Sequence, residues 1–139
     1  MATAPIQPGL ARNLETVGAH MAGEASDPAS IMHLYTDDVV LEVPGRGVRL
    51  SDKPAIEANY RRMFNSMADI TITPVARYGE GDWVVDDCIA CFRLVGDGMV
   101  NAPVPIGSKV RLRLIHLFMM RNGLISRETV FESWELPAV

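Results

Sequence analysis

The hydrophobic residues follow a helical spacing early in the chain and a strand spacing later. Two sets recur at i, i+4, i+7 and i+11: Leu10, Leu14, Val17 and Met21, and then Ile56, Tyr60, Met63 and Met67. This spacing places each set on one face of a helix. After Met67 apolar and polar residues alternate, which is typical of strands with one buried face.

Residues with strong positional preferences mark the ends of these elements. The segment "SDPAS" (26–30) supplies a cap and a first-turn proline for a short helix that runs through Tyr35. Ser51 or Asp52, followed by Pro54, begins the helix that carries the second apolar set. The predicted strands cover residues 39–44, 69–78 with an edge or bulge at Pro74, 83–95, 110–120 and 124–134. Helices followed by strands predict an α+β fold, with the helices packed in the concave face of a strongly curved antiparallel sheet.

Composition narrows the class of protein. The 139 residues are enough for one domain, so we expect a disordered tail over 1–8 and a single domain over 9–139. A net charge of −4 argues against nucleic acid or an anionic membrane surface as a partner. The N-terminus lacks the pattern of a secretory signal, and no stretch of about 18 apolar residues is present. These features predict a cytoplasmic protein with no membrane partner.

Cys88 and Cys91 form a C-x-x-C pattern inside "WVVDDCIACFRLV". Residues three apart in a strand point to opposite faces, so these two thiols are not expected to pair. Structural zinc requires four ligands, and no such set is present. The sequence therefore predicts buried, inert cysteines and no metal.

His116 lies in the middle of an apolar strand, in "RLRLIHLFMMRNGLI" (111–125). A three-residue turn with Gly123 in the left-handed conformation would place His116 opposite Glu128, whereas a two-residue Asn-Gly turn would place it opposite Thr129. We favour the first register because a His–Glu pair would offset the cost of burying either charge. The shared inner face would then carry Leu114, His116, Phe118, Glu128, Val130, Glu132 and Trp134.

The outer face of the same hairpin carries Ile115, Leu117 and Met119, which predicts a homodimer that covers it. A His–Glu pair can also be a core feature that only fixes register. The convergence of three polar groups inside a curved sheet favours a functional site.

The closing segment "VPIGSKVRLRLIHLFMMRNGLISRETVFESW" (104–134) resembles the last hairpin of the nuclear-transport-factor-2-like superfamily, in its SnoaL-like branch. The resemblance extends over about residues 10–135 and implies a cone-shaped α+β barrel. The superfamily includes polyketide cyclases, ketosteroid isomerases, epoxide hydrolases, dehydratases and non-catalytic binding modules.

Motif residues of these enzymes match this chain only in part. Val43 stands where ketosteroid isomerases have their base, and Val130 where epoxide hydrolases have an aspartate, so neither chemistry is expected. By resemblance His116 takes the place of the oxyanion-hole acid, and Tyr60 in "AIEANY" that of its supporting tyrosine. The first-helix tyrosine has no counterpart, and His20 is among the nearest polar residues.

The resemblance implies a cofactor-independent enzyme that moves a proton on a hydrophobic polycyclic, polyketide, steroid or aromatic molecule, by isomerisation, cyclisation, dehydration or lyase chemistry. His116 would be the general acid or base, oriented by Glu128. Tyr60 would donate a hydrogen bond to a substrate oxygen, and Glu132 would be a second carboxylate. The expected substrate contacts are Leu114, Phe118, Val130, Val43, Trp134 and Met63. The alternative is a non-catalytic small-molecule-binding or dimerisation module, and the sequence leaves open whether Asp86 or Asp87 faces the cavity.

Overall fold

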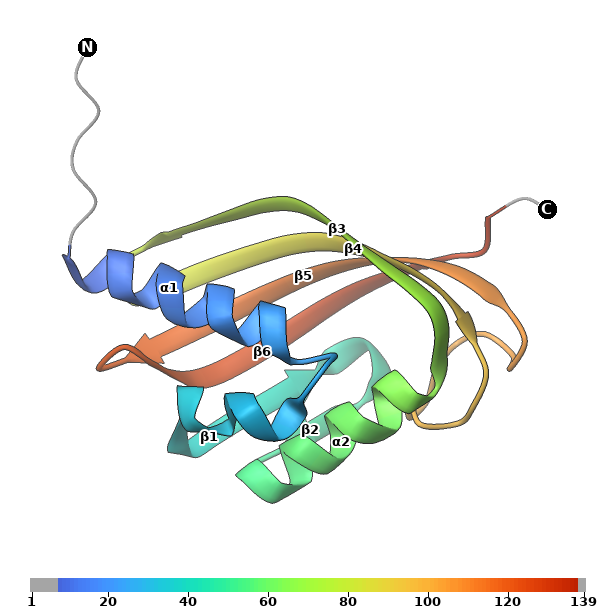
Figure 1. Ribbon diagram of the computed structural model, residues 1–139, viewed down its shortest axis with the longest axis horizontal. Coiled ribbons are helices and arrows are strands. Elements are labelled where there is room, and N and C mark those ends of the chain that lie inside the picture. Colours follow the sequence, from blue (N-terminus) through green and yellow to red (C-terminus); the bar gives the residue numbers. More distant parts are fainter. Residues whose placement is uncertain (1–7, 138–139) are drawn as a thin grey trace, which may run out of the picture.

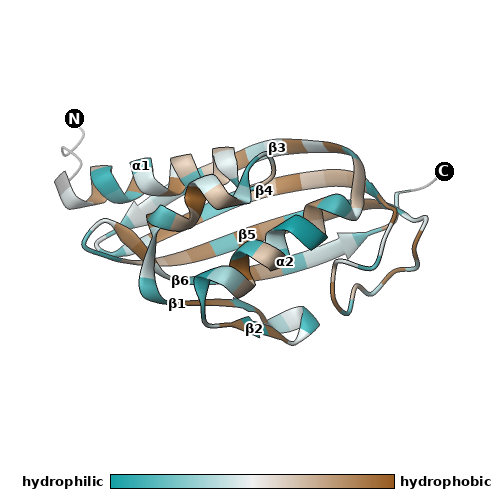
Figure 2. Cartoon of the chain, turned by 60° about the horizontal axis from the view of Figure 1, so that its bottom comes forward, coloured by the Kyte–Doolittle hydropathy of each residue, from teal (hydrophilic) through white to brown (hydrophobic). Residues whose placement is uncertain are grey.

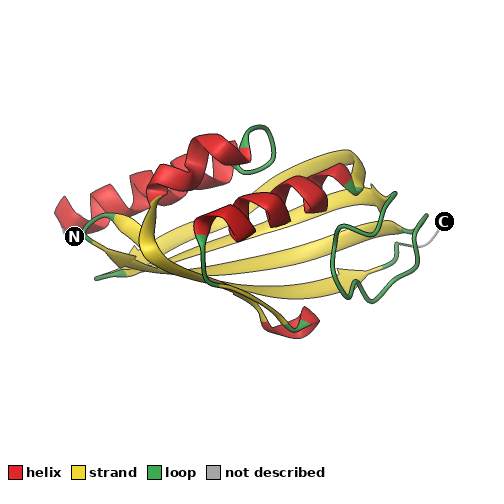
Figure 3. Cartoon of the chain, turned by 90° about the horizontal axis from the view of Figure 1, so that it is seen from below, coloured by secondary structure: helices red, strands yellow, loops and turns green. Residues whose placement is uncertain are grey.

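The computed structural model describes residues 8–137, in which helices cover one face of a curved six-stranded sheet (Figures 1 and 3). The helical elements are α1 (Pro8–Gly23), the 3₁₀ segments η1 (Pro28–Leu34) and η2 (Pro44–Arg46), and α2 (Lys53–Asn65). The strands are β1 (Tyr35–Val43), β2 (Val48–Leu50), β3 (Met67–Glu80), β4 (Trp83–Leu94), β5 (Lys109–Arg121) and β6 (Leu124–Glu135). The α+β prediction is confirmed, and apart from Pro8 the predicted tail lies outside the described residues.

The sheet is mixed, with the strand order β2-β1-β6-β5-β4-β3. Strands β1 and β6 run parallel, so the prediction of an antiparallel sheet is wrong for this pair. The chain crosses by α2 to the far edge and starts β3 opposite in direction to β1, and three reversals then bring β6 parallel to β1. The sheet bends around the helices without closing, and β2 and β3 are its edges.

Most element boundaries follow from local chemistry. Asp52 caps α2 by accepting a hydrogen bond from the Ala55 backbone N–H at 2.8 Å. Pro74 lies in edge strand β3 beside a register shift, as predicted, because an edge strand tolerates the loss of one N–H. Met67 begins β3 instead of ending the helix, and β1 begins at Tyr35 rather than at residue 39.

The hairpin between β5 and β6 follows neither predicted register. Asn122 and Gly123, with φ of 53° and 76°, form a two-residue turn that pairs Arg121 with Leu124. One extra residue, Ser126, then makes a bulge, and its hydroxyl donates to the Met119 carbonyl at 2.9 Å.

His116 therefore pairs with Val130, and Glu128 pairs with Phe118. The two-residue turn shifts the pairing by one position from the predicted three-residue turn, and the bulge shifts it by one more, so the pairing differs from the predicted one by two positions. Beyond the bulge, a shift of two keeps every side chain on its predicted face while it changes every partner. Between the turn and the bulge the shift is one, so Ile125 rather than Leu124 opposes Met120.

The described residues bury two hydrophobic clusters, and apolar positions follow the sheet beneath the helices (Figure 2). The larger cluster joins α1, η1, β1 and α2 to the sheet and includes Val17, Ile31, Tyr35, Leu41, Ile56 and Phe118. The smaller cluster includes Ala90, Phe92, Leu94, Met99, Val110 and Leu112. No helix in residues 8–137 has the length and hydropathy needed to cross a membrane.

Candidate functional site

A narrow pocket opens where the two clusters meet, between α2 and the inner face of the sheet. The cavity itself holds about 40 Å³, and the space counted out into its open mouth is about 580 Å³. The wall is mainly apolar and includes Leu41, Val43, Met63, Phe64, Met67, Met99, Leu112, Leu114 and Val130. The ionisable and hydrogen-bonding groups in the wall are Glu24, Arg46, Asn59, Tyr60, Cys88, His116 and Glu132.

Most of the residues predicted from sequence reach this wall. His116, Tyr60, Glu132, Leu114, Val130, Val43 and Met63 all line the pocket. Phe118, Trp134 and Glu128 lie outside the wall. Phe118 is fully buried and stacks on the His116 ring with centroids 5.9 Å apart, while Trp134 packs edge-on against Phe92.

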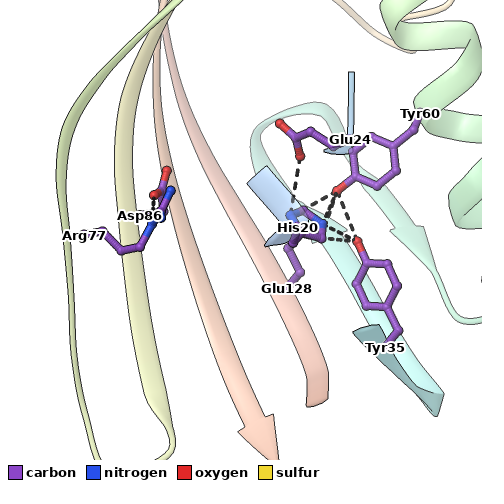
Figure 4. Close-up of polar contacts among 7 residues, drawn as sticks. All are labelled: His20, Glu24, Tyr35, Tyr60, Arg77, Asp86 and Glu128. Carbon is purple, nitrogen blue, oxygen red and sulfur yellow. Dashed lines mark hydrogen bonds and ion pairs between the residues drawn. The ribbon is translucent and has the colours of Figure 1, made fainter. Parts of the chain in front are cut away.

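The Glu128 carboxylate is completely buried beneath the pocket, where it is held by three aromatic side chains (Figure 4). Its Oε1 accepts hydrogen bonds from the hydroxyls of Tyr35 and Tyr60, both at 2.9 Å. The His20 Nε2 lies 3.5 Å from the same oxygen and 2.6 Å from the Tyr35 hydroxyl. We call Glu128, Tyr35, Tyr60 and His20 the sealed cluster.

The sealed cluster fixes its protonation states. Burial raises the pKa of Glu128, but the close approach of the His20 charge, the nearby His116 and the hydrogen bond from Tyr35 outweigh it and lower the value to about 2. Burial lowers the pKa of His20, and the Glu128 charge outweighs it and raises the value. The cluster therefore holds a permanent carboxylate beside an imidazole that favours its charged form.

Glu128 does not hold His116 in the predicted way. Among the described residues no direct hydrogen bond joins them, and the His116 Nδ1 has no partner. Tyr60 also differs from the prediction, because its hydroxyl proton is directed to Glu128 rather than into the pocket. Glu128 therefore supports the site from below, while Tyr60 lines the pocket with its hydroxyl bound to Glu128.

Glu24 is a carboxyl group that the sequence pattern did not single out. It follows the last turn of α1, is 4% exposed and lines the pocket. Its Oε2 has no hydrogen-bond partner and lies 3.7 Å from the His20 Nδ1. Burial raises the pKa of Glu24 to about 8, with the His20 charge only partly opposing it, so the group is a neutral acid at neutral pH.

His116 has the opposite character. Burial lowers its pKa, and the positive charge of His20 adds to the effect, although Glu128 and Asp86 act against it. The imidazole is therefore neutral at neutral pH; the residue lines the pocket, and its Nδ1 is buried without a hydrogen-bond partner. A neutral imidazole can accept a proton, and a neutral carboxyl can donate one.

Glu132 is neutralised by a residue the sequence did not connect to it. Arg46 donates to its two carboxylate oxygens at 2.9 and 3.3 Å, and both side chains are nearly fully buried. Arg46 also donates to the Val100 carbonyl, and Asn101 donates to the Arg46 carbonyl, so the pair ties segment 95–108 to the pocket wall. Glu132 could act as a second catalytic carboxylate only if its oxygens were released from Arg46.

Asp86, not Asp87, lies on the inner face. Asp86 is 4% exposed and accepts from Arg77 Nε at 2.7 Å (Figure 4). Asp87 lies on the outer face, where Arg113 Nη2 donates to it at 2.6 Å, and this hydrogen bond lowers its pKa.

Cys88 and Cys91 are on opposite faces and unbonded, as expected, and burial raises the pKa of the Cys88 thiol to about 12.

Two groups of buried side chains within residues 8–137 come close enough to share a metal ion. They are Asp86, Cys88 and His116, and His20, Glu24 and Glu128, with ligand atoms within 4.8 Å of one another in each group. Arg77 already neutralises Asp86, and two tyrosines already donate to Glu128. Neither group presents three uncommitted ligands.

A signal for the missed residues exists in the sequence. Asn13, Thr16, His20 and Glu24 recur at i, i+3, i+7 and i+11, so α1 carries a polar stripe beside its apolar one. All four are buried, and the Thr16 hydroxyl donates to the Gly123 carbonyl at 2.7 Å, which ties the helix to the hairpin turn. A polar stripe on a packed helix predicts that the surface it packs against carries polar partners.

The chain belongs to the SnoaL-like domain family, whose model matches residues 17–128. No curated protein matches the chain.

Among solved structures, a protein named for a SnoaL-like polyketide cyclase from Jannaschia sp. CCS1 has a TM-score of 0.80 at 18% identity, covering 94% of this chain and 92% of that chain. A phenazine biosynthesis-related protein from Pseudomonas aeruginosa has a TM-score of 0.76 at 14% identity, with coverages of 94% and 83%. An epoxide hydrolase from M. tuberculosis has a TM-score of 0.68 at 17% identity, with coverages of 91% and 86%. At these identities the similarity establishes the fold.

Proposed function

We propose that this protein is a cofactor-independent enzyme that moves a proton on a hydrophobic small molecule. The observation that supports this most directly is the pairing of two titratable groups in one largely apolar pocket. Glu24 holds its proton at neutral pH and His116 does not hold one. Titratable groups whose environments push their pKa values in opposite directions are the usual acid and base of a proton-transfer site.

In this proposal His116 is the general base and takes a proton from a substrate carbon or hydroxyl. Glu24 is the general acid and donates to the oxygen on which negative charge develops. Glu128 and Tyr60 are positioning residues, because Glu128 fixes His20 and Tyr60 beneath the pocket. Isomerisation, cyclisation, dehydration and lyase reactions all use this pair of proton transfers.

The charge of the wall supports a neutral substrate. Arg46 and Glu132 neutralise each other, and Glu24 and His116 are both uncharged at neutral pH. The three methionines in the wall, Met63, Met67 and Met99, are flexible apolar side chains that adapt to irregular ligands. Steroids, polyketides and aromatic ketones fit this description.

Deuterium exchange tests the proposal whichever of these reactions the protein catalyses. A panel of neutral ketones from these three classes is incubated with the protein in D₂O, and incorporation next to the carbonyl is followed by NMR. We expect protein-dependent exchange, about 10²- to 10⁴-fold slower in His116→Ala and reduced in Glu24→Gln. Panel members that bind with no exchange above background would instead support the non-catalytic binding module.

We also propose that the protein is a cytoplasmic homodimer through the outer face of the sheet. Ile115, Leu117 and Met119 are half-buried there, and Phe131 on the neighbouring strand is 49% exposed. A contiguous apolar face of this kind is unusual on a monomer. Light scattering at micromolar concentration should give twice the chain mass, and Phe131→Lys should shift the mass toward the monomer.

A further inference from the structure

Asp86 is the titratable residue directly across the sheet from His116. The two residues are register partners in β4 and β5, and both are 4% exposed on the inner face. Their ionisable atoms, together with the Cys88 sulfur, lie within 4.8 Å of one another. Cross-strand partners on one face are the closest contacts in a sheet, so Asp86 is the carboxylate placed by the fold to act on His116.

Asp86 also borders a second opening. An open groove beside α1 is lined by Gly18, Met21, Ala22, Ile72, Pro74, Arg77, Asp86 and Cys88. Ile72 and Cys88 line both this groove and the pocket, so they form part of the partition between the two. Arg77, which holds Asp86, has 37% of its side chain exposed at this groove.

The rival carboxylate, Glu128, is placed differently. It is 0% exposed, and its oxygens already receive the two tyrosine hydroxyls and face His20. Within the described residues the one hydrogen-bonded partner of the Asp86 side chain is Arg77. Asp86 therefore contacts solvent through the groove while Glu128 has no route to it.

We propose that Asp86, held by Arg77, is the positioning residue for the His116 base, and that the proton His116 takes leaves through the groove rather than through the substrate mouth. The proposal rests on the proposed function. The imidazole accepts the substrate proton, and the bonding electron pair stays on the substrate. The imidazolium then loses this proton to water in the groove by way of the Asp86 carboxylate, because Asp86 lines the groove and His116 does not. This restores the neutral base while the pocket is occupied.

The charged and titratable groups that face His116 come from four elements. Asp86 and Cys88 lie on β4, Glu128 on β6 and His20 on α1, with Arg77 on β3 behind Asp86. Asp86 favours the imidazolium, and Arg77 weakens that effect by neutralising Asp86. Removing Asp86 and removing Arg77 should therefore move the His116 titration in opposite directions.

Histidine NMR titrations of the full chain test this without a substrate. In Asp86→Asn the His116 pKa should fall and its ring tautomer, read from nitrogen shifts, should change. In Arg77→Gln the His116 pKa should rise. Asp87→Asn is the matched control, because it removes an Arg-paired aspartate from the adjacent position on the outer face and should leave His116 at its wild-type value.

An unchanged His116 pKa in both Asp86→Asn and Arg77→Gln, or an equal change in Asp87→Asn, would overturn the proposal. If Asp86→Asn does not fold, the direction of the His116 pKa shift in Arg77→Gln decides alone.

With a substrate from the exchange panel, Asp86→Asn should lower kcat at unchanged KM and move the acid limb of the kcat profile to lower pH. A change confined to KM would contradict the positioning role. Because the titrations need no activity, they separate this proposal from the failure of the proposed reaction.

Discussion

The sealed cluster and the pocket wall lie against each other, yet their carboxyl groups Glu128 and Glu24 have opposite surroundings. In the sealed cluster the Glu128 carboxylate is hydrogen-bonded to two tyrosines and faces His20, whose Nδ1 has no hydrogen-bond partner. In the wall, an oxygen of Glu24 and a nitrogen of His116 are buried without partners. Unsatisfied buried polar groups are costly and infrequent. Three of them occur where the cluster and the wall meet, with the Glu24 oxygen 3.7 Å from the His20 nitrogen.

The comparison also separates support from chemistry. The sealed cluster holds charges at neutral pH, while the two wall residues remain uncharged. A fixed charge beneath the pocket can tune the wall groups without taking part in proton transfer. Substitutions on the two sides of this division should therefore have different effects, and the largest is expected in the sealed cluster.

Glu128→Gln should be the most destabilising of these changes. The substitution keeps the shape but removes the charge that the His20 imidazolium faces, and breaking a fully buried pair costs about 3–5 kcal/mol. Urea denaturation at neutral pH measures the loss. Glu135→Gln, at an exposed pair with Arg111, is the control and should unfold like the wild type. A loss below about 1 kcal/mol would show that the sealed cluster does not anchor the fold.

Glu132→Gln should cost somewhat less, about 2–3 kcal/mol, because the Arg46 charge left behind borders the pocket and can be reached by water. It should also release segment 95–108, since Arg46 holds the Val100 carbonyl. Hydrogen exchange by mass spectrometry would locate the change, with faster exchange in this segment than in β3. Uniformly faster exchange would contradict the tie between the ion pair and the segment.

Tyr35→Phe and Tyr60→Phe compare the sealed cluster with the wall directly. Each removes one hydroxyl that donates to Glu128, which should cost about 1.5–3 kcal/mol of stability for a hydrogen bond to a charged group. Tyr60 also lines the pocket, whereas Tyr35 does not. Calorimetric titration with a ligand from the exchange panel should therefore show weaker binding in Tyr60→Phe and near wild-type binding in Tyr35→Phe. Equal losses of affinity would remove the distinction between the two regions.

The sequence predicts which face a residue is on more securely than which residue it touches. His116, Glu128 and Glu132 share the inner face as predicted, because facing depends only on whether an offset is odd or even. Their partners were not predictable, because the two-residue turn and the bulged residue Ser126 each shift the ladder by one position, two in all relative to the predicted register. The facing of Asp86 and Asp87 was open because both alternating sets in β4 contain apolar residues.

Contacts between helix and sheet could not be predicted from the sequence for a different reason. Glu24 and His20 meet the pocket and Glu128 only through the docking of α1, and no local pattern fixes that docking. Arg46 likewise reaches Glu132 across 86 positions of the chain. Glu24, the general acid of the proposed reaction, was therefore not predicted, although it belongs to the polar stripe of α1.

The smallest predicted effect is a change in the pH dependence of stability through Glu24. The pKa of this carboxyl is about 8 in the folded protein, against an ordinary value of 4.5. Between these values the folded protein holds a proton that the unfolded chain has released, so wild-type stability should fall as pH rises from about 5 to about 9. Glu24→Gln cannot titrate, and its denaturation midpoint should fall less over the same range. By about pH 9 the variant should gain on the wild type by at least roughly 1 kcal/mol relative to their difference at about pH 5. Glu15→Gln, on the exposed face of α1, is the matched control and should track the wild type. Parallel curves for wild type and Glu24→Gln would mean that Glu24 ionises normally, and that the wall has no neutral acid to pair with His116.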